Sequence, residues 1–177
     1  MGASDRPCVG SWAVVVADPH HPGPGPVVIG GLGGSATRVY AALLQEAGYH
    51  IGVDLNGARD NLWATLLLKR RHELLADPAR AAVALGLLRK KMAGGGRMSL
   101  RELLLLLQTT WRVSTGRGSF RRGGWPLVRA ARLLLSRPRL GMESRGWGFK
   151  EPNSHVFLES LASSYPDLRF IYVLRHG

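Results

Sequence analysis

Residues 27–38, which read VVIGGLGGSATR, decide the fold of this chain. The run at 27–29 is β-branched, which is typical of a buried strand, and it leads directly into a stretch of glycines. Residues 39–47 then have the apolar spacing of a helix, and Gly48 is suited to end it. A second short strand is predicted at 49–53. This order of strand, glycine loop, helix and strand predicts an α/β domain with a parallel sheet.

The glycine loop predicts an anion-binding site. Glycines let the backbone turn sharply and direct its N–H groups inward, and the positive end of the following helix dipole favours a phosphate or sulfate. Ser35 and Thr37 can add hydroxyl donors, and Arg38 can add a guanidinium. The loop lacks the lysine of the nucleoside triphosphatase motif G-x-x-x-x-G-K-[ST], and it fits the dinucleotide fingerprint poorly. The alternative interpretation is a tight connection between strand and helix that binds nothing.

The C-terminal part of the sequence also has an α/β pattern. Short strands are predicted at 147–150 and 170–174, with a helix at 154–165 between them. A parallel sheet usually continues into a helix that covers it, whereas this sequence ends at Gly177, soon after a core strand. We therefore expect residues 27–177 to form a partial domain whose C-terminal part is missing.

The region 61–145 is predicted to be a mainly helical, variable insertion in this domain. Pro78 and Ser99 are suited to helix starts, and Glu102 completes a capping box with Ser99. Helices are expected at 61–75, at 79–92, from Ser99 onward and at 127–136, with breaks at 94–96 and 114–126. Residues 1–26 end in alternating proline and glycine, which predicts a flexible leader.

The composition describes a basic, globular domain. Of the 177 residues, 45% are hydrophobic and 20% charged, a balance that excludes an intrinsically disordered chain. The net charge of +12 favours anionic partners such as a phosphorylated cofactor, nucleic acid, sulfated glycan or acidic membrane. Arginine supplies most of this charge, so the coding bias of a GC-rich genome is an alternative cause. The single cysteine, Cys8, allows no disulfide within the chain, and the sequence has no convincing signal peptide or membrane span, so a cytoplasmic location is predicted.

Three segments resemble PAPS-dependent sulfotransferases of the bacterial and carbohydrate type, where PAPS is 3'-phosphoadenosine 5'-phosphosulfate. Residues 35–38, after the first strand, resemble the family's 5'-phosphosulfate loop, and residues 147–152 (WGFKEP) resemble its W-G-x-K-x-P segment. Residues 170–177 resemble the strand and the R-H-P or R-N-P turn that begin its 3'-phosphate site. The resemblance implies a three-layer fold like that of P-loop nucleoside triphosphatases and nucleotide kinases. It also implies PAPS as the sulfonyl donor and no metal.

The resemblance further implies a role for particular residues. The loop from Gly33 to Arg38 would hold the 5'-phosphosulfate, through Gly33, Gly34, Ser35, Ala36, Thr37 and Arg38. Arg175 would contact the 3'-phosphate, and Lys150 would lie near the transferring sulfonyl group. Two positions depart from the family pattern, because Gly34 replaces a common lysine and Ala36 replaces a glycine. If that second position requires positive φ, alanine there costs about 1 kcal/mol.

A general base is needed to take the acceptor's proton. Pro152 stands where cytosolic family members carry a histidine, so the base has to come from elsewhere. Asp60 and then Asp54 are the candidates, with Glu151 a weaker third. The alternative interpretation is that Asp54 or Asn56 caps a helix and that Asp60 pairs with a nearby arginine, Arg59 or Arg38. Lys150 likewise has an alternative, as an ordinary solvated lysine.

The acceptor and the alternatives to catalysis stay open at this point. The resemblance implies a hydroxyl or amine acceptor on a sugar, lipid or metabolite. One rival interpretation is nucleic-acid binding by the arginine-rich stretch 112–145, with the interleaved aromatic residues Trp111, Phe120, Trp125 and Trp147 stacking on bases. No known nucleic-acid motif supports it. The other rival is an inactive scaffold of the same fold, which the early C-terminus and Ala36 favour.

Overall fold

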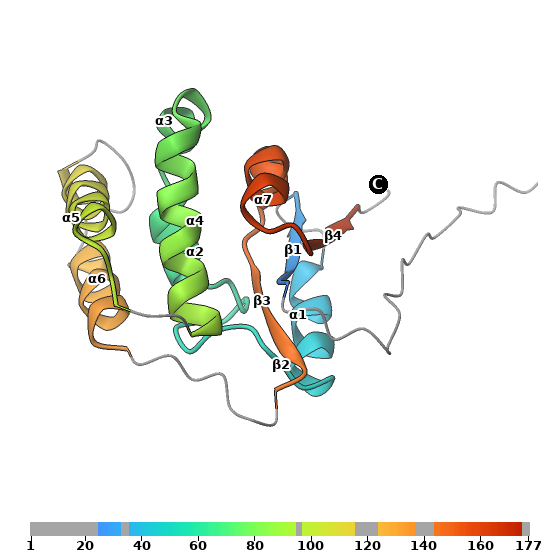
Figure 1. Cartoon of the computed structure of the whole chain (residues 1–177). Coiled ribbons are helices and arrows are strands. Elements are labelled where there is room, and N and C mark those ends of the chain that lie inside the picture. Colours follow the sequence, from blue (N-terminus) through green and yellow to red (C-terminus); the bar gives the residue numbers. More distant parts are fainter. Residues whose placement is uncertain (1–24, 33–35, 95–96, 116–123, 137–143, 175–177) are drawn as a thin grey trace, which may run out of the picture.

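The computed structural model describes residues 25–32, 36–94, 97–115, 124–136 and 144–174. Its sheet has four parallel strands in the order β2-β3-β1-β4 (Figure 1). The strands are β1 (Val27–Gly31), β2 (Tyr49–His50), β3 (Gly146–Lys150) and β4 (Arg169–Val173). An α/β fold with an all-parallel sheet was the prediction, and this part of it is confirmed.

Strand β1 lies in the centre of the sheet, paired on one side with β3 and on the other with β4. Its residue Ile29 is opposite Lys150 of β3 and Ile171 of β4. Gly148 of β3 has to be glycine, because a Cβ there would lie 2.2 Å from the Val27 carbonyl oxygen. The close approach of β3 to β1 therefore depends on that glycine.

Both faces of the sheet are covered. Helix α1 (Thr37–Glu46) packs on one face, where Ile29, Ala41 and Val173 share a small apolar cluster. The other face, which carries Val28 and Phe149, packs against α7 (Leu158–Ser164) and the helical region. Strand β1 is buried on both sides, which explains why its sequence is a continuous apolar run and does not alternate.

The helical region, residues 62–136, lies beside the sheet in successive layers, with α5 and α6 farthest from it (Figure 1). Its helices are α2 (Leu62–Leu67), α3 (Arg71–Ala76), α4 (Pro78–Ala93), α5 (Leu100–Thr115) and α6 (Trp125–Leu135). Leucine and alanine side chains of α2, α4, α5 and α6 form one core cluster with the covered face of the sheet. This region therefore supplies most of the buried apolar surface among the described residues.

Two predicted elements are shorter than the sequence pattern indicated. The single helix expected at 61–75 is wrong, because α2 ends at Leu67 and α3 begins at Arg71. The backbone leaves the helical conformation between them, at Arg70, which has φ −89° and ψ 64°. The strand expected at 49–53 stops at His50, the last residue that pairs with β3, and at Gly52 the backbone has φ 117°, a conformation that strands do not adopt.

The predicted helix starts at Pro78 and Ser99 are confirmed. Asp77 accepts a hydrogen bond of 3.0 Å from the Arg80 N–H, with Pro78 in the first turn. Ser99 and Glu102 form a reciprocal capping box, in which the Ser99 N–H donates to Glu102 at 2.7 Å. None of the helices in the described ranges has the length and apolar composition needed to cross a bilayer.

Candidate functional site

The candidate site lies at the carboxyl ends of β1 and β3. The chain leaves β1 toward the glycine loop and α1, which leads to β2, whereas it leaves β3 toward α7, which leads to β4. The two connections run in opposite directions from neighbouring strands, and such a switch point is where parallel α/β sheets form ligand-binding crevices. Backbone hydrogen bonds hold the segment after β3 against the end of β1, from Gly31 N–H to Pro152 at 2.8 Å and from Glu151 N–H to Ile29 at 3.1 Å.

The loop after β1 is described at its start and at its end. Ala36, which stands where the resembled family has a glycine, has φ 58° and ψ 21°, the left-handed conformation considered above for this position. Thr37 is buried at the first position of α1, and Arg38 is exposed beside it. Gly33, Gly34 and Ser35 lie outside the described residues, as does Arg175, so their predicted contacts with the cofactor stay predictions.

Lys150, the last residue of β3, is a buried lysine with only 3% of its surface exposed. Its ammonium group forms an ion pair with Asp60 and donates a 3.1 Å hydrogen bond to the Ala58 carbonyl. A lysine is almost never buried without such partners. Lys150 is therefore not a solvated surface lysine, and two of the three predicted catalytic residues, Lys150 and Asp60, lie in contact.

Asp60 is positioned by a short loop that Asn56 organises. The Asn56 side chain accepts hydrogen bonds of 2.9 Å from the N–H groups of Ala58 and Asp60, and its amide donates to Asp60 at 2.7 Å. Such bonds from an asparagine to its own following backbone fix a tight turn. Arg59, in the same turn, has φ 62°. Its guanidinium donates a hydrogen bond to Gln45, and not to Asp60, the partner considered for it from the sequence. Asp60 thus has fixed geometry and a charged partner in Lys150.

Asp54 has a different environment from Asp60. It is buried, and its Oδ1 accepts hydrogen bonds from Arg129 at 2.6 Å and from Arg132 at 2.8 Å, both on α6. The helix-capping role considered for Asp54 or Asn56 belongs to Asn61, which accepts from the N–H groups of Trp63 and Ala64 at the start of α2. Asp54 therefore joins the sheet to α6, and the described contacts do not bring it to Lys150.

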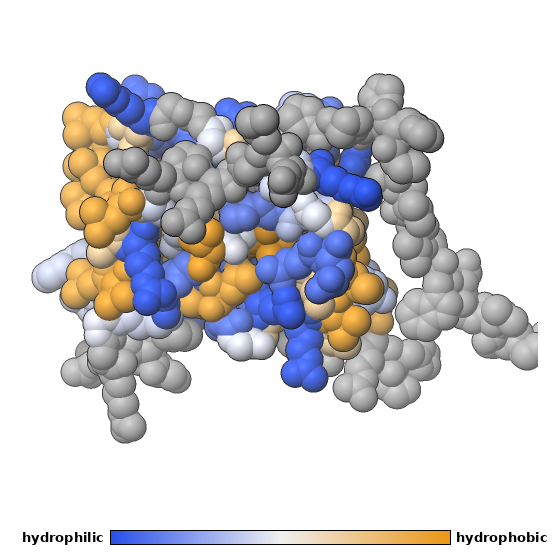
Figure 2. Space-filling model, turned by 90° about the horizontal axis from the view of Figure 1, so that it is seen from below, coloured by the Kyte–Doolittle hydropathy of each residue, from blue (hydrophilic) through white to orange (hydrophobic). Residues whose placement is uncertain are grey.

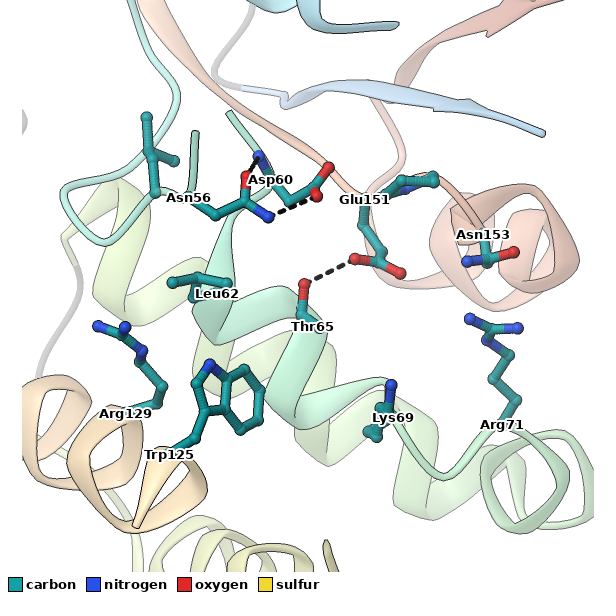
Figure 3. A pocket seen from close by; sticks show the side chains of 12 residues that line it. Asn56, Asp60, Leu62, Thr65, Lys69, Arg71, Trp125, Arg129, Glu151 and Asn153 are labelled. Atoms are coloured by element: carbon teal, nitrogen blue, oxygen red, sulfur yellow. Dashed lines mark hydrogen bonds between the residues drawn. The ribbon is translucent and has the colours of Figure 1, made fainter. Parts of the chain in front are cut away.

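A cavity of about 390 Å³ opens next to Asp60 and Glu151, a size suited to a small ligand. Figure 3 shows the two carboxylates together on one wall, with Trp125 and Arg129 of α6 and, on the other side, Lys69 and Arg71 around them. Glu151 is buried and accepts a 2.7 Å hydrogen bond from the Thr65 hydroxyl. The cavity thus carries acidic groups next to Lys150 and basic groups farther out.

The pKa of Lys69, one of the basic residues that line the cavity, is lower than that of an ordinary lysine. Burial lowers the pKa of Lys69, the nearby Arg71 lowers it further, and Glu151 opposes both effects. A lysine whose charge is disfavoured in this way is poised to gain from an anionic or hydrogen-bond-accepting ligand. Sequence reasoning missed Lys69, Arg71 and Thr65, because only the fold brings α2 and α3 to the end of β3.

The aromatic residues considered for base stacking have separate environments. Trp147 is 2% exposed and packs edge-on against Tyr165 in the core, with ring centroids 5.6 Å apart. Trp125 lines the cavity, whereas Trp111 is on the outer side of α5. Phe120 lies outside the described residues. Trp147 is therefore a core residue and is not available to stack on a base.

The described residues contain no group of three or more histidine, cysteine, aspartate or glutamate side chains that could hold a metal ion. Comparison of the chain with protein-family models, with curated proteins and with solved structures found no match. A function for this chain therefore has to be inferred from the residues of the site.

Proposed function

We propose that this chain is a sulfotransferase domain that moves a sulfonyl group from PAPS to a hydroxyl or amine acceptor. The observation that carries the proposal is the buried Lys150 at the carboxyl end of β3, next to the end of β1 from which the glycine loop leaves. A buried ammonium group and a glycine loop at one switch point suit a ligand with several negative charges. The strand order and the helices on both faces support the finer assignment to a three-layer, P-loop-like fold.

The hydrogen-bond donors and cations around the end of β1 suit the 5'-phosphosulfate of PAPS. The N-terminal turn of α1, with Thr37 and Arg38, offers N–H groups, a hydroxyl and a guanidinium. Lys150 adds a cation from the neighbouring strand, in place of the loop lysine that Gly34 replaces. In the proposed complex, Arg175, which follows β4 in the sequence, binds the 3'-phosphate. Each anionic end of one nucleotide then has its own cationic group.

Lys150 and Asp60 divide the proposed chemistry between them. When bound, PAPS supplies a sulfonyl group on a phosphate leaving group. Lys150 would hold the phosphate leaving group and offer it a fixed cation, in the way that fixed cations assist phosphoryl transfer. Asp60 takes the proton of the acceptor as the acceptor oxygen or nitrogen bonds to sulfur. Asp54 acts as a positioning residue, because its two arginine partners fix α6 beside the cavity.

The cavity beside Asp60 is the proposed acceptor site. It lies against Asp60 and Glu151, at the end of the strand that carries Lys150. Trp125 offers an apolar surface on its wall and Lys69 with Arg71 offers cations, so a polar acceptor with a flat or ring-shaped part fits this lining (Figure 3). The acceptor's chemical class is tested most directly by screening sugars, lipids and metabolites with labelled PAPS.

The proposal is tested with PAP, the desulfonated product 3'-phosphoadenosine 5'-phosphate. We expect PAP to bind in isothermal titration and to raise the melting temperature, since a ligand that binds only the folded state stabilises it. Absence of both heat and thermal shift would end the proposal. Steep, salt-dependent nucleic-acid binding without a response to PAP would favour the rival nucleic-acid function. PAP binding without turnover of any acceptor would identify an inactive scaffold.

Replacing Lys150 tests the role of that residue. We expect Lys150→Met to lower kcat/KM for sulfonyl transfer by about a hundredfold or more, comparable with the loss of one fixed group that stabilises transition-state charge. The control is Lys91→Met, because Lys91 is a half-buried lysine that, like Lys150, donates to backbone carbonyl groups, here those of Leu134 and Ser136 at the end of α6. Equal losses in the two variants would show that Lys150 acts only through folding.

A further inference from the structure

The cavity beside Asp60 carries polar groups that the proposed chemistry does not use. Apolar side chains lie exposed at the end of the molecule that α5 and α6 form (Figure 2), but they carry no group that selects a particular ligand. The cavity differs, because the half-buried side chains of Arg71 and Asn153 line it and have no hydrogen bond or ion pair within the described residues. Polar groups that are partly withdrawn from water and lack a protein partner are available to a ligand.

Arg71 and Asn153 reach the cavity from different elements. Arg71 is the first residue of α3, whereas Asn153 lies in the segment between β3 and α7. Figure 3 shows the Arg71 side chain extending from α3 toward Asn153, on the side of the cavity away from Trp125. A guanidinium and an amide that line one cavity can together offer several N–H donors to a single group of a ligand.

The two carboxylates that line the cavity are already engaged. Asp60 forms its ion pair with Lys150. Glu151 accepts a hydrogen bond from α2, and its charge acts on Lys69, whose pKa it raises against the effect of burial. Neither carboxylate lies within ion-pair distance of Arg71. The charge of Arg71 is therefore left for a partner that the described contacts do not supply.

Positive charge exceeds negative charge around the cavity when the ion pairs are included. Arg129, the remaining cation of the lining, is paired with Asp54 on the far side of α6 from the solvent. The lining and its ion-pair partners hold four cations, namely Lys69, Arg71, Arg129 and Lys150, and three carboxylates, namely Asp54, Asp60 and Glu151. Arg132 also binds Asp54 and adds to the excess. The charge of the cavity thus favours a ligand that carries negative charge.

Lys69 supports the same preference. Burial lowers its pKa most, and the positive charge of Arg71 lowers it further. An anionic group bound beside the two side chains would oppose both effects, because it favours the charged form of the lysine.

We infer that Arg71, together with Asn153, binds an anionic group of the ligand that occupies this cavity, namely a carboxylate, a sulfate or a phosphate. The fork of an arginine matches two oxygens of such a group, and an amide N–H can donate to the same group. A neutral ligand would bury the guanidinium further and leave it without a partner. That the ligand is the sulfonyl acceptor rests on the proposed function, whereas the binding of an anion does not.

A set of 4-nitrophenyl β-D-glucosides that differ only at carbon 6 tests this inference. The set consists of the neutral glucoside, the glucuronide with its carboxylate, the 6-sulfate and the 6-phosphate. In isothermal titration of the full chain, at least one anionic member should bind about tenfold or more tightly than the neutral one, because it adds charge-assisted hydrogen bonds. The member that binds most tightly identifies the anionic group.

Replacing Arg71 tests whether this residue is the cause of the preference. Arg71→Gln should weaken binding of the preferred anionic glucoside by about tenfold and leave the neutral one unchanged, whereas Arg71→Lys should retain part of the preference, since the charge stays but the fork is lost. Asn153→Ala should have a smaller effect, because its amide is neutral. The matched control is Arg80→Gln, since Arg80 is also half-buried, bonds only to Gln108 and does not line the cavity. It should change neither affinity.

Three results would overturn the inference. One is that no anionic glucoside binds more tightly than the neutral one. Another is an equal loss in Arg71→Gln and Arg80→Gln, which would mean attraction by net charge alone. The third is displacement of the bound anionic glucoside by PAP, which would place the nucleotide in this cavity. If PAP fails to bind while the preference for an anion and its dependence on Arg71 hold, the sulfotransferase proposal fails and the anionic ligand stands.

Discussion

The sheet region, residues 25–61 and 144–174, and the helical region bury charge to different extents. Among the described residues, the sheet region buries three charged side chains near its strand ends, those of Asp54, Lys150 and Glu151, whereas the helical region buries one, Glu102. Exposed leucines do not separate the two regions, since Leu135 of the helical region is 83% exposed and Leu174 of the sheet region 60%. Buried charge requires partners, so its concentration at the strand ends points to a chemical site there.

The largest loss of stability is expected from replacing Asp54, the carboxylate that joins the two regions through its ion pairs with α6. We expect Asp54→Ala to lower the free energy of unfolding by about 3–5 kcal/mol, because it leaves the partly buried Arg129 guanidinium without its ion-pair partner. Chemical denaturation measures this change. The control is Asp77→Ala, which removes only the cap of α4 and should cost about 1 kcal/mol. Similar costs in the two variants would show that the Asp54 ion pairs do not hold the regions together.

Glu102, the buried carboxylate of the helical region, should give an intermediate and pH-dependent effect. Burial raises its pKa, but the Ser99 N–H group and the Lys90 ammonium outweigh burial, so the pKa of Glu102 in the folded state is lowered. A lowered folded-state pKa means that its stabilisation is complete above the unfolded-state value of about 4.3 and is lost as pH falls below it.

Comparison with Glu102→Gln measures this stabilisation. At neutral pH the unchanged chain should exceed the variant by about 1–2 kcal/mol in free energy of unfolding, since a charge-assisted bond becomes a neutral one. The difference should shrink toward zero as the pH is lowered through the range of the folded carboxyl group. Glu159→Gln, on the exposed side of α7, serves as the surface control and should change stability by less than about 0.5 kcal/mol at any pH. A difference for Glu102→Gln that is independent of pH would contradict the charge-based account.

The sequence predicted the sheet region better than the helical region. The strand–loop–helix unit that begins at Val27 is recognisable because its signals are local: a β-branched run, glycines and helical spacing. The ends of β2 and of α2 are followed by changes of backbone conformation at Gly52 and Arg70, which the apolar pattern does not reveal, so local pattern placed both ends too far along the chain. The capping box at Ser99 is local, and it was predicted correctly.

The candidate site shows the same division. Lys150 and Asp60 were both singled out from the sequence, but their ion pair joins residues far apart in the chain and only the fold brings them together. The arginine partners of Asp54 lie on α6, and no sequence signal links that helix to the segment after β2. The exposed leucines of α5 were visible as a run, yet which of them face the core depends on how α5 packs against α4 and α6.

The smallest expected effect concerns backbone strain, which also separates the two regions. Among the described residues, the non-glycine residues with positive φ are Ala36 and Arg59, both in loops beside the candidate site. We expect Ala36→Gly to raise the free energy of unfolding by about 0.5–1 kcal/mol, because glycine adopts φ 58° without a Cβ clash. The greater conformational freedom of glycine in the unfolded chain cancels part of this stabilisation. Ala82→Gly, at an exposed position inside α4, is the matched control and should cost about 1 kcal/mol. If Ala36→Gly destabilised the chain as Ala82→Gly does, the loop would not require a left-handed residue, and Arg59 would be the remaining candidate for backbone strain.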